Sequence, residues 1–356
     1  MSRYINGRVS ALTPYVPGEQ PVERKYIKLN TNESPYPPSP GVMRAVLEEV
    51  GRLQLYSDPE CKAVTLEAAN YYGVQPDEIL MTNGSDEILN FAFMAYGDET
   101  TPFVFPEITY GFYPVFADLN GIPYRTVPLE ADFSIDPTKF HDAGGNVVIA
   151  NPNAPTGLSL SVKEIEGILQ TNPNHMVVID EAYVDFGGET CLSLIDQYDN
   201  LLITRTFSKS YSLAGARLGF GIGNRALIAD LNTIKFSTNP YNVNRMTMAA
   251  GKAALEENSY YTDHCSDIMA TREFTRRELM SRGFQVTDSN ANFLFAKHPQ
   301  LDGQVLYEEL KEQGVLIRHF SNPLICQYNR ITVGTVEQMK ALLEAIDRII
   351  EKRKDA

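Results

Sequence analysis

The sequence has few cysteines, fewer basic than acidic residues and no long apolar run, and each absence narrows what the chain can be. Its four cysteines lie far apart, without the short spacings of a zinc site or a disulfide framework. We therefore expect a cytoplasmic protein that holds no metal. With 31 basic and 45 acidic residues, the formal net charge is −14, which repels nucleic acid phosphates.

Membrane association is also not expected. The opening stretch MSRYINGRVSALTPYVPG lacks the apolar core of a signal peptide. No apolar run approaches the roughly 20 residues that cross a bilayer. Soluble small molecules are therefore the expected partners, with neither nucleic acid nor a membrane involved. No G-x-G-x-x-G follows the first predicted strand, which argues against a nucleotide-binding Rossmann protein.

The order of apolar and amphipathic stretches predicts an α/β fold. The first forty residues are rich in proline, asparagine and tyrosine and predict an extended arm with turns. Beyond them, short and nearly continuous apolar runs alternate with helical patterns, as in a mostly parallel central sheet between helices. The predicted strands lie in 77–82, 101–106, 145–150, 175–183 and 200–206, and predicted helices include 85–96, 109–121 and 161–171.

The pattern of helices and strands changes near residue 250, which predicts a second, smaller α+β domain. Long charged helices now alternate with short strands. The predicted strands are 292–298, 314–320 and 330–334, and the predicted helices are 267–284, 303–314 and 335–354. We expect an arm over residues 1–40, a large domain over 41–250 and a small domain over 251–356.

Polar residues interrupt the apolar runs where several predicted strands end. Asn151, Asp180 and Lys209 follow three of these strands at equal spacings of 29 residues, one strand–helix–strand step each. Ligands of parallel sheets bind at this edge. Alone, each residue is explained by a turn, a helix cap or simple exposure. Together they supply an amine, a carboxylate and an amide at successive strand ends.

One ligand needs all three groups. Pyridoxal 5′-phosphate has an aldehyde that joins an amine, a ring nitrogen that a carboxylate keeps protonated, and a phenolic oxygen that accepts hydrogen bonds. Its phosphate needs a cradle, which a helix beginning at Ser85 and Asp86 after Asn83–Gly84 provides through free N–H groups. Ser208 and Arg217 add a hydroxyl and a cation. The Asp86 carboxylate would have to turn away or cap that helix.

Four motifs carry a family resemblance. NPNAPTG, DEAY, TFSKSYSLAGARLGF and NRITVG occur in this order across nearly the whole chain. Together they resemble the fold-type I, class I/II pyridoxal-phosphate aminotransferases. The resemblance implies an enzyme with a large domain built on a mostly parallel sheet, a small C-terminal domain and an N-terminal arm.

The resemblance also implies roles for individual residues. Lys209 would bind the cofactor's aldehyde and move the substrate's proton, and Asp180 would pair with the ring nitrogen. Asn151 and Tyr183 would donate to the phenolic oxygen, and Tyr110 would stack on the ring. The residues implied around the phosphate are Gly84, Ser85, Asp86, Thr206, Ser208 and Arg217. Tyr56 would reach the cofactor of a second subunit, which implies a homodimer with shared sites.

Within the family, LTPYVPGEQP and LNTNESPYPPSP are most similar to the histidinol-phosphate aminotransferase subfamily. By this resemblance, Arg318 and Arg330 bind the phosphate of histidinol phosphate in one half-reaction and a carboxylate of glutamate or 2-oxoglutarate in the other. Tyr15 would close the pocket, and Asn32 and Glu33 would line it. Two departures, NES for Asn-Glu-Asn and NAP for a second asparagine, are expected to leave the chemistry untouched.

Other functions fit the same scaffold. An aromatic amino-acid aminotransferase or a threonine-phosphate decarboxylase would share most of the implied cofactor residues. A binding module that holds the cofactor without catalysis is a remoter alternative, because the set of lysine, aspartate, asparagine and tyrosine and the two arginines would then have no use.

Overall fold

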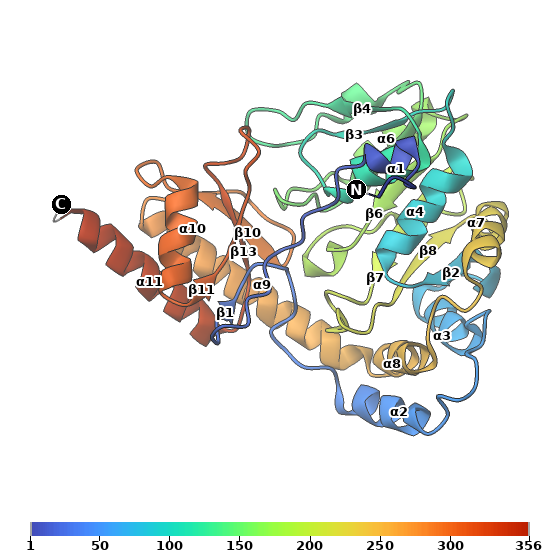
Figure 1. Cartoon of the computed structure of the whole chain (residues 1–356), viewed down its shortest axis with the longest axis horizontal. Coiled ribbons are helices and arrows are strands. Elements are labelled where there is room, and N and C mark those ends of the chain that lie inside the picture. The colour runs from blue at the N-terminus through green and yellow to red at the C-terminus, as the bar shows by residue number, and fades with distance from the viewer. Residues whose placement is uncertain (1, 355–356) are drawn as a thin grey trace.

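The fold is seen in a computed structural model that describes residues 2–354. A large and a smaller body lie side by side, and the long helix α9 (Asn258–Ser281) runs from one to the other (Figure 1). None of the described helices is long and apolar enough to cross a membrane.

A seven-stranded sheet forms the centre of the large body, in the order β2-β8-β7-β6-β5-β3-β4. Only β8 runs antiparallel to its neighbours, and the remaining pairs are parallel. The predicted α/β fold with a mostly parallel sheet is therefore confirmed. The strands are β2 (Ile79–Thr82), β3 (Phe103–Pro106), β4 (Tyr124–Val127), β5 (Asn146–Ala150), β6 (Val177–Asp180), β7 (Leu201–Thr206) and β8 (Gly219–Gly223).

Helices cover both faces of this sheet, because the strands are apolar on both sides. Val147 and Ile149 of β5 pack on one face and Val148 on the other, in two separate cores. The first core includes α3 (Lys62–Tyr72), α6 (Val162–Thr171) and α8 (Arg245–Glu256), with α2 (Pro40–Val50) packed on α8. The second includes α4 (Ser85–Tyr96), α5 (Phe112–Asn120) and α7 (Arg225–Thr238).

The smaller body is an antiparallel sheet packed against helices. Its strand order is β12-β13-β10-β9, and its core is built from α9, α10 and α11. The elements are β9 (Gln285–Val286), β10 (Phe293–Lys297), α10 (Gly303–Glu312), β12 (Arg318–His319), β13 (Asn329–Thr332) and α11 (Val336–Lys354).

The N-terminal segment runs across both bodies. After the short helix α1 (Gly7–Ser10), it crosses to the smaller body, where β1 (Ile27–Lys28) pairs in parallel with β11 (Val315–Leu316). Leu29 is buried in the core of the smaller body. This pairing carries Asn30 to Glu33 to the place where the two bodies meet. The predicted domain limits themselves remain a prediction.

Several strands differ from the sequence prediction, and the two-residue strands β1 and β9 were among those not predicted. The single strand expected over 314–320 is split, because its first half pairs with the arm as β11 and its second half pairs with β13 as β12. β4 was not predicted, since Tyr124, Arg125 and Thr126 are exposed at the sheet edge and give no apolar run. β8 was not predicted either, because its sequence is GFGIG.

Four short 3-10 turns complete the fold, namely η1 (Pro76–Glu78), η2 (Pro137–Phe140), η3 (Val184–Phe186) and η4 (Cys191–Leu194).

Candidate active site

The carboxyl ends of the parallel strands meet at one cavity of about 190 Å³. Asp180, the last residue of β6, stands opposite Ala150 of β5 and Thr204 of β7 in the register. Lys209 lies in the loop that follows β7. The cavity brings together most of the predicted cofactor residues, namely Ser85, Asp86, Tyr110, Asp180, Tyr183, Thr206, Ser208, Lys209 and Arg217.

The amine of Lys209 reaches into this cavity with few partners. Among residues 2–354 it makes one hydrogen bond, donated to the carbonyl oxygen of Thr31 over 3.3 Å. It lies 5.7 Å from the centre of the Tyr183 ring. No carboxylate forms an ion pair with it in the described part of the chain. The amine is thus held near the cavity while remaining free to bind a group placed there.

Asp180 is a buried carboxylate with neutral partners only. Its side chain accepts hydrogen bonds from the hydroxyls of Tyr113 (3.0 Å) and Thr204 (3.2 Å). Burial raises its pKa from 3.8 to about 6, although these two hydroxyls lower it. Within residues 2–354 no basic side chain pairs with it, so a cation brought by a ligand would stabilise it. Tyr113 was missed by sequence reasoning, because a tyrosine in an apolar helix looks like an ordinary core residue.

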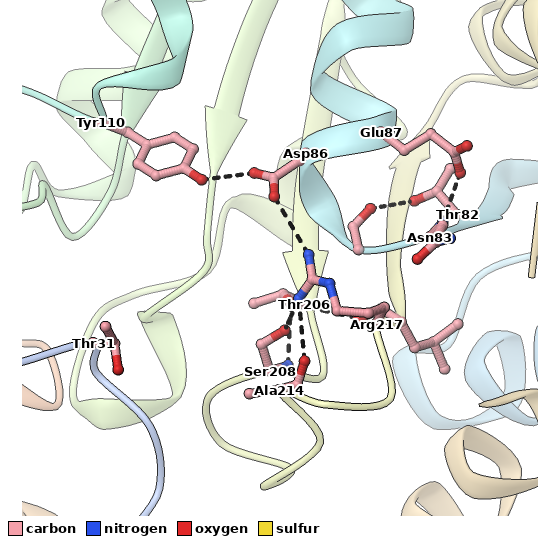
Figure 2. A network of polar contacts seen from close by, with 12 residues as sticks. Thr31, Thr82, Asn83, Asp86, Glu87, Tyr110, Thr206, Ser208, Ala214 and Arg217 are labelled. Atoms are coloured by element: carbon pink, nitrogen blue, oxygen red, sulfur yellow. Dashed lines mark hydrogen bonds and ion pairs between the residues drawn. The ribbon is translucent and has the colours of Figure 1, made fainter. Parts of the chain in front are cut away.

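The opposite end of the cavity has the features of an anion site. Gly84 precedes α4 with a φ of 79°, and no side chain caps the first turn of that helix. The Arg217 guanidinium donates to the Ser208 hydroxyl over 3.2 Å (Figure 2). The Thr206 hydroxyl accepts from the backbone N–H of Ser208 over 3.1 Å. Backbone N–H groups, hydroxyls and a cation therefore converge here.

Asp86 does not cap its helix. Its carboxylate lies between the Tyr110 hydroxyl, which donates to it over 2.7 Å, and Arg217 at 3.3 Å (Figure 2). Burial, followed by the nearby Asp86, raises the pKa of Tyr110, which keeps the phenol protonated as a donor. The carboxylate thus ties the predicted stacking residue to the predicted phosphate-binding arginine.

Asn151 does not reach the cavity, which corrects its predicted placement. Its amide binds the backbone of Leu160 at both ends, donating to the carbonyl oxygen over 3.0 Å and accepting from the N–H over 2.8 Å. Ala154, three residues on, lines the cavity instead. The departure NAP therefore falls on the cavity wall, contrary to the expectation that it lies away from the chemistry. The amide of Asn32 instead donates to the Tyr183 hydroxyl, over 2.9 Å.

A second cavity of about 510 Å³ adjoins the first and shares Tyr110, Tyr183 and Lys209 with it. It is lined by Tyr15, Asn32, Arg318 and Arg330 among others, which are four of the five residues that the resemblance implies for the substrate. Tyr15 is stacked on Phe112 with ring centres 4.3 Å apart. Glu33 instead lines the first cavity, where it forms an ion pair with Lys28.

Arg330 is a cation without an anion. Its guanidinium donates to the Asn30 carbonyl oxygen over 3.1 Å and lies over the rings of Phe293 and Phe320. Its Nε has no partner, and no described acidic residue pairs with it. Burial lowers its pKa. Arg318 donates to the carbonyl oxygens of Val16 and Pro17 over 3.0–3.1 Å. Two guanidinium groups that form no ion pair with an acid of residues 2–354 therefore line the second cavity.

Tyr56 lies outside both cavities of its own chain. Its side chain is 80% exposed and stacks on Tyr241 with ring centres 4.7 Å apart. The segment that carries it is held by Arg245, which donates to the Tyr56 carbonyl oxygen over 2.8 Å. Ser57 also donates to the Val243 carbonyl oxygen over 2.8 Å. An exposed aromatic pair is thus presented on an anchored loop.

Comparison with known proteins identifies the family. Residues 24–346 match the model of aminotransferase class I and II. The chain belongs to this family. It is 48% identical to histidinol-phosphate aminotransferase 2 of Dechloromonas aromatica, over 98% of this chain and 99% of that protein. It is 45% identical to histidinol-phosphate aminotransferase of Clostridium beijerinckii, over 98% of each chain.

The solved structures agree on the fold. Histidinol-phosphate aminotransferase from Sinorhizobium meliloti, in complex with pyridoxal 5′-phosphate, superposes with a TM-score of 0.89 at 24% identity, over 99% of both chains. The predicted family and the predicted large and small sheets are thereby confirmed.

Proposed function

We propose that the protein transfers an amino group between L-histidinol phosphate and 2-oxoglutarate, giving imidazole acetol phosphate and glutamate. The family match confirms the predicted enzyme class and, with it, pyridoxal 5′-phosphate as the cofactor. The predicted activity is the one that the relatives' names carry. The observation that bears most on the substrate is the unpaired guanidinium of Arg330 in the cavity beside Lys209.

The residues present fit pyridoxal phosphate. The buried Asp180 carboxylate has no cationic partner among the described residues, and a protonated ring nitrogen would provide one. The N–H groups of the first turn of α4, with Thr206, Ser208 and Arg217, would hold the phosphate. Tyr110 would stack on the ring and Tyr183 would donate to its oxygen. When bound, the cofactor supplies an electron sink for bond breaking at the α-carbon of the substrate.

Each protein group then has a definite task. Asp180 would hold the proton of the ring nitrogen, because its carboxylate is buried and has no cationic partner among the described residues. Lys209 would hold the cofactor's aldehyde and, as a free base, would take the proton from the α-carbon of the substrate. Arg330 and Arg318 fix the distant anion of the substrate, which orients the α-carbon–hydrogen bond toward Lys209.

One anion pocket serves both half-reactions. In the first, the two guanidinium groups hold the phosphate of histidinol phosphate. In the second, they hold a carboxylate of 2-oxoglutarate. A guanidinium suits both anions, since each offers a pair of oxygens to its parallel N–H donors. Arg318 would exchange the carbonyl oxygens of Val16 and Pro17 for the incoming anion.

A homodimer in the cytoplasm completes the proposal. An apolar groove of about 720 Å³ lies between α2, α8 and the loop that carries Arg217. Leu47 and Met43 at this groove are 71% and 50% exposed. A second copy of the chain would cover this surface and bring its Tyr56 to the cofactor site. The groove also borders Arg217, so the two surfaces are continuous.

An amine panel tests the function. Purified protein with pyridoxal phosphate and 2-oxoglutarate is given L-histidinol phosphate, phenylalanine, tyrosine or threonine phosphate, and glutamate is measured. We expect histidinol phosphate to give a kcat/KM at least about tenfold above phenylalanine and tyrosine, because neither of these brings a phosphate to the anion pocket. Faster turnover of an aromatic amino acid would contradict the proposal, as would carbon dioxide released from threonine phosphate without an oxo acid.

A further inference from the structure

A second group of charged and polar side chains lies on the face of the strand ends opposite to the cofactor cavity. Side chains alternate along a strand, and the register partners Asp180 and Thr204 share the cavity face. The residues that follow them, Glu181 and Arg205, therefore point to the reverse face. Their side chains are 0% and 8% exposed, and Nε of Arg205 lies 3.3 Å from Oε2 of Glu181.

This ion pair continues to the neighbour of the lysine. Nη1 of Arg205 donates to Oδ1 of Asp185 over 2.8 Å. The Ser210 hydroxyl donates to Oδ2 of the same carboxylate over 2.6 Å. Ser210 directly follows Lys209 and is buried. Four side chains thus form an unbroken chain of contacts from the end of β6 to the loop that holds the lysine.

The chain of contacts is anchored at its far end. The Glu181 carboxylate accepts the backbone N–H of Cys191 over 2.6 Å and the Thr190 hydroxyl over 2.8 Å. Both come from the segment at η4. Glu181 is therefore held by neutral donors as well as by Arg205.

The turn that carries Asp185 is fixed as well. Arg272 of α9 donates through one nitrogen to the carbonyl oxygens of Phe186 and Ala291, over 2.8 Å each. Phe186 follows Asp185 in η3, and Ala291 precedes β10 of the smaller body. Asp185 is therefore a stationary point to which the Ser210 hydroxyl is tied.

The charge in the middle of this group is permanent. Burial lowers the pKa of Arg205, but the carboxylate of Asp185, the phenol of Tyr72 and the carboxylate of Glu181 outweigh it, and the pKa lies above its ordinary value. A charged guanidinium strengthens its hydrogen bonds to both carboxylates. The Arg205 guanidinium therefore keeps its charge near neutral pH.

Lys209 itself has little to hold it. Its amine has the one hydrogen bond to Thr31, over 3.3 Å, so the backbone of its loop decides where the amine lies. We propose that Asp185, acting through Ser210 and with Arg205 behind it, is a positioning residue that sets the place of the Lys209 amine. The proposal rests on the assignment of Lys209 as the cofactor lysine. Asp185, Ser210 and Arg205 are not among the residues that line the two cavities.

The test compares holoenzymes carrying Ser210→Ala, Asp185→Asn or the control Ser161→Ala. Ser161 caps α6 and is not among the residues that line either cavity. Its substitution also removes a side-chain hydrogen bond, so it is a matched control. Three quantities are measured: the visible circular dichroism divided by the absorbance of the bound cofactor, kcat with KM, and the melting temperature. Visible circular dichroism reports how firmly the cofactor is held in one orientation, which general loss of stability does not alter.

We expect Ser210→Ala and Asp185→Asn to lower kcat about tenfold or more with KM changed less than about twofold, because misplacing a catalytic group by less than 1 Å slows the chemical step. Their dichroism ratio should fall at least about twofold. Ser161→Ala should change the melting temperature only. If the Ser210 and Asp185 variants keep the wild-type ratio and kcat, the inference is wrong. Wild-type protein without a visible cofactor band would instead contradict the assignment of Lys209.

Discussion

At the residue scale, the buried Asp180 and the half-buried Arg330 each lack a partner of opposite charge among the described residues. Asp180 is a carboxylate without a described cation, and Arg330 is a cation without a described carboxylate. An unpaired buried charge destabilises a folded protein unless a ligand supplies the partner. The two lie at different cavities that share Lys209 between them. A bound cofactor with a cationic ring nitrogen would supply the partner of Asp180, and a bound substrate with an anionic group would supply the partner of Arg330.

The raised pKa of Asp180 predicts how the cofactor-free protein responds to pH. Its folded-state pKa of about 6 exceeds the ordinary 3.8, so between these values the folded protein binds a proton that the unfolded chain releases. The free energy of unfolding should therefore fall as pH rises from about 4 to 6 and stay level above, by roughly 2–3 kcal/mol from this group.

Asp180→Asn isolates that contribution. The variant cannot ionise at this position, so cofactor-free Asp180→Asn should be more stable than wild type at pH 8 and nearly equal to it at pH 4. Urea unfolding of both proteins at several pH values measures the difference. A difference that does not vary with pH would show that the carboxylate is not buried as described.

Sequence reasoning found residues whose chemistry is unusual for their place and missed those that look ordinary. Lys209 and Asp180 were found because charged groups interrupt apolar runs at a regular spacing. Asn151 was placed wrongly, because the spacing fixes where a strand ends and not which residue of the following turn faces the cavity. Tyr113 was missed because its hydroxyl contact with Asp180 crosses from α5 to β6, which no local pattern records.

At the scale of elements, β8 decides the geometry of the phosphate end. It lies directly beneath the first turn of α4, since a Cβ on Gly219 would come within 2.3 Å of the Ser85 backbone nitrogen. A Cβ on Gly221 would come within 2.8 Å of the Ile88 side chain. Glycine at alternate positions of the strand lets the helix approach the sheet closely. These same glycines remove the apolar alternation by which a strand is normally recognised.

Gly219→Ala should therefore damage both the fold and the cofactor site. The added methyl group must push the α4 backbone outward, which should lower the free energy of unfolding by about 1–3 kcal/mol. Cofactor affinity should fall as well, because the displaced N–H of Ser85 belongs to the proposed phosphate cradle. Gly51→Ala is the control, since nothing lies within 4 Å of a Cβ there and its φ is −69°. Urea unfolding and cofactor titration measure both effects. An affinity equal to that of Gly51→Ala would contradict this geometry.

Elements with local signals were predicted well, and those fixed by distant contacts were not. The helix predicted over 85–96 has these limits in the structure, because Gly84 and Gly97 flank a continuous amphipathic segment. The strand predicted over 314–320 is divided, because β1, nearly 290 residues earlier, takes its first half as a partner. Pairing between distant segments depends on the assembled surfaces of both, which a local pattern does not contain.

At the scale of the whole molecule, the exposed Tyr56 and the uncovered apolar groove have one common explanation in a shared-site dimer. Hybrid dimers test it. Lys209→Ala homodimers should be inactive, and Tyr56→Ala homodimers should lose about tenfold or more. In a hybrid of the two variants, one site combines Lys209 of one subunit with Tyr56 of the other, and both are intact there. Equal amounts, unfolded and refolded together, should recover about a quarter of wild-type activity, because random pairing makes half of the dimers hybrid with one good site each.

The control mixes the Lys209→Ala variant with a double variant that carries both Lys209→Ala and Tyr56→Ala. No intact site can form in this mixture, so no activity should return. The position of the groove agrees with a shared site. The groove adjoins Arg217, so a second subunit bound in it would lie next to the proposed phosphate end of the cavity. If the first mixture is only as active as the mean of the two separate homodimers, Tyr56 does not act on the site of the second subunit. Recovery would instead mean that the site described for one chain is completed only by a second.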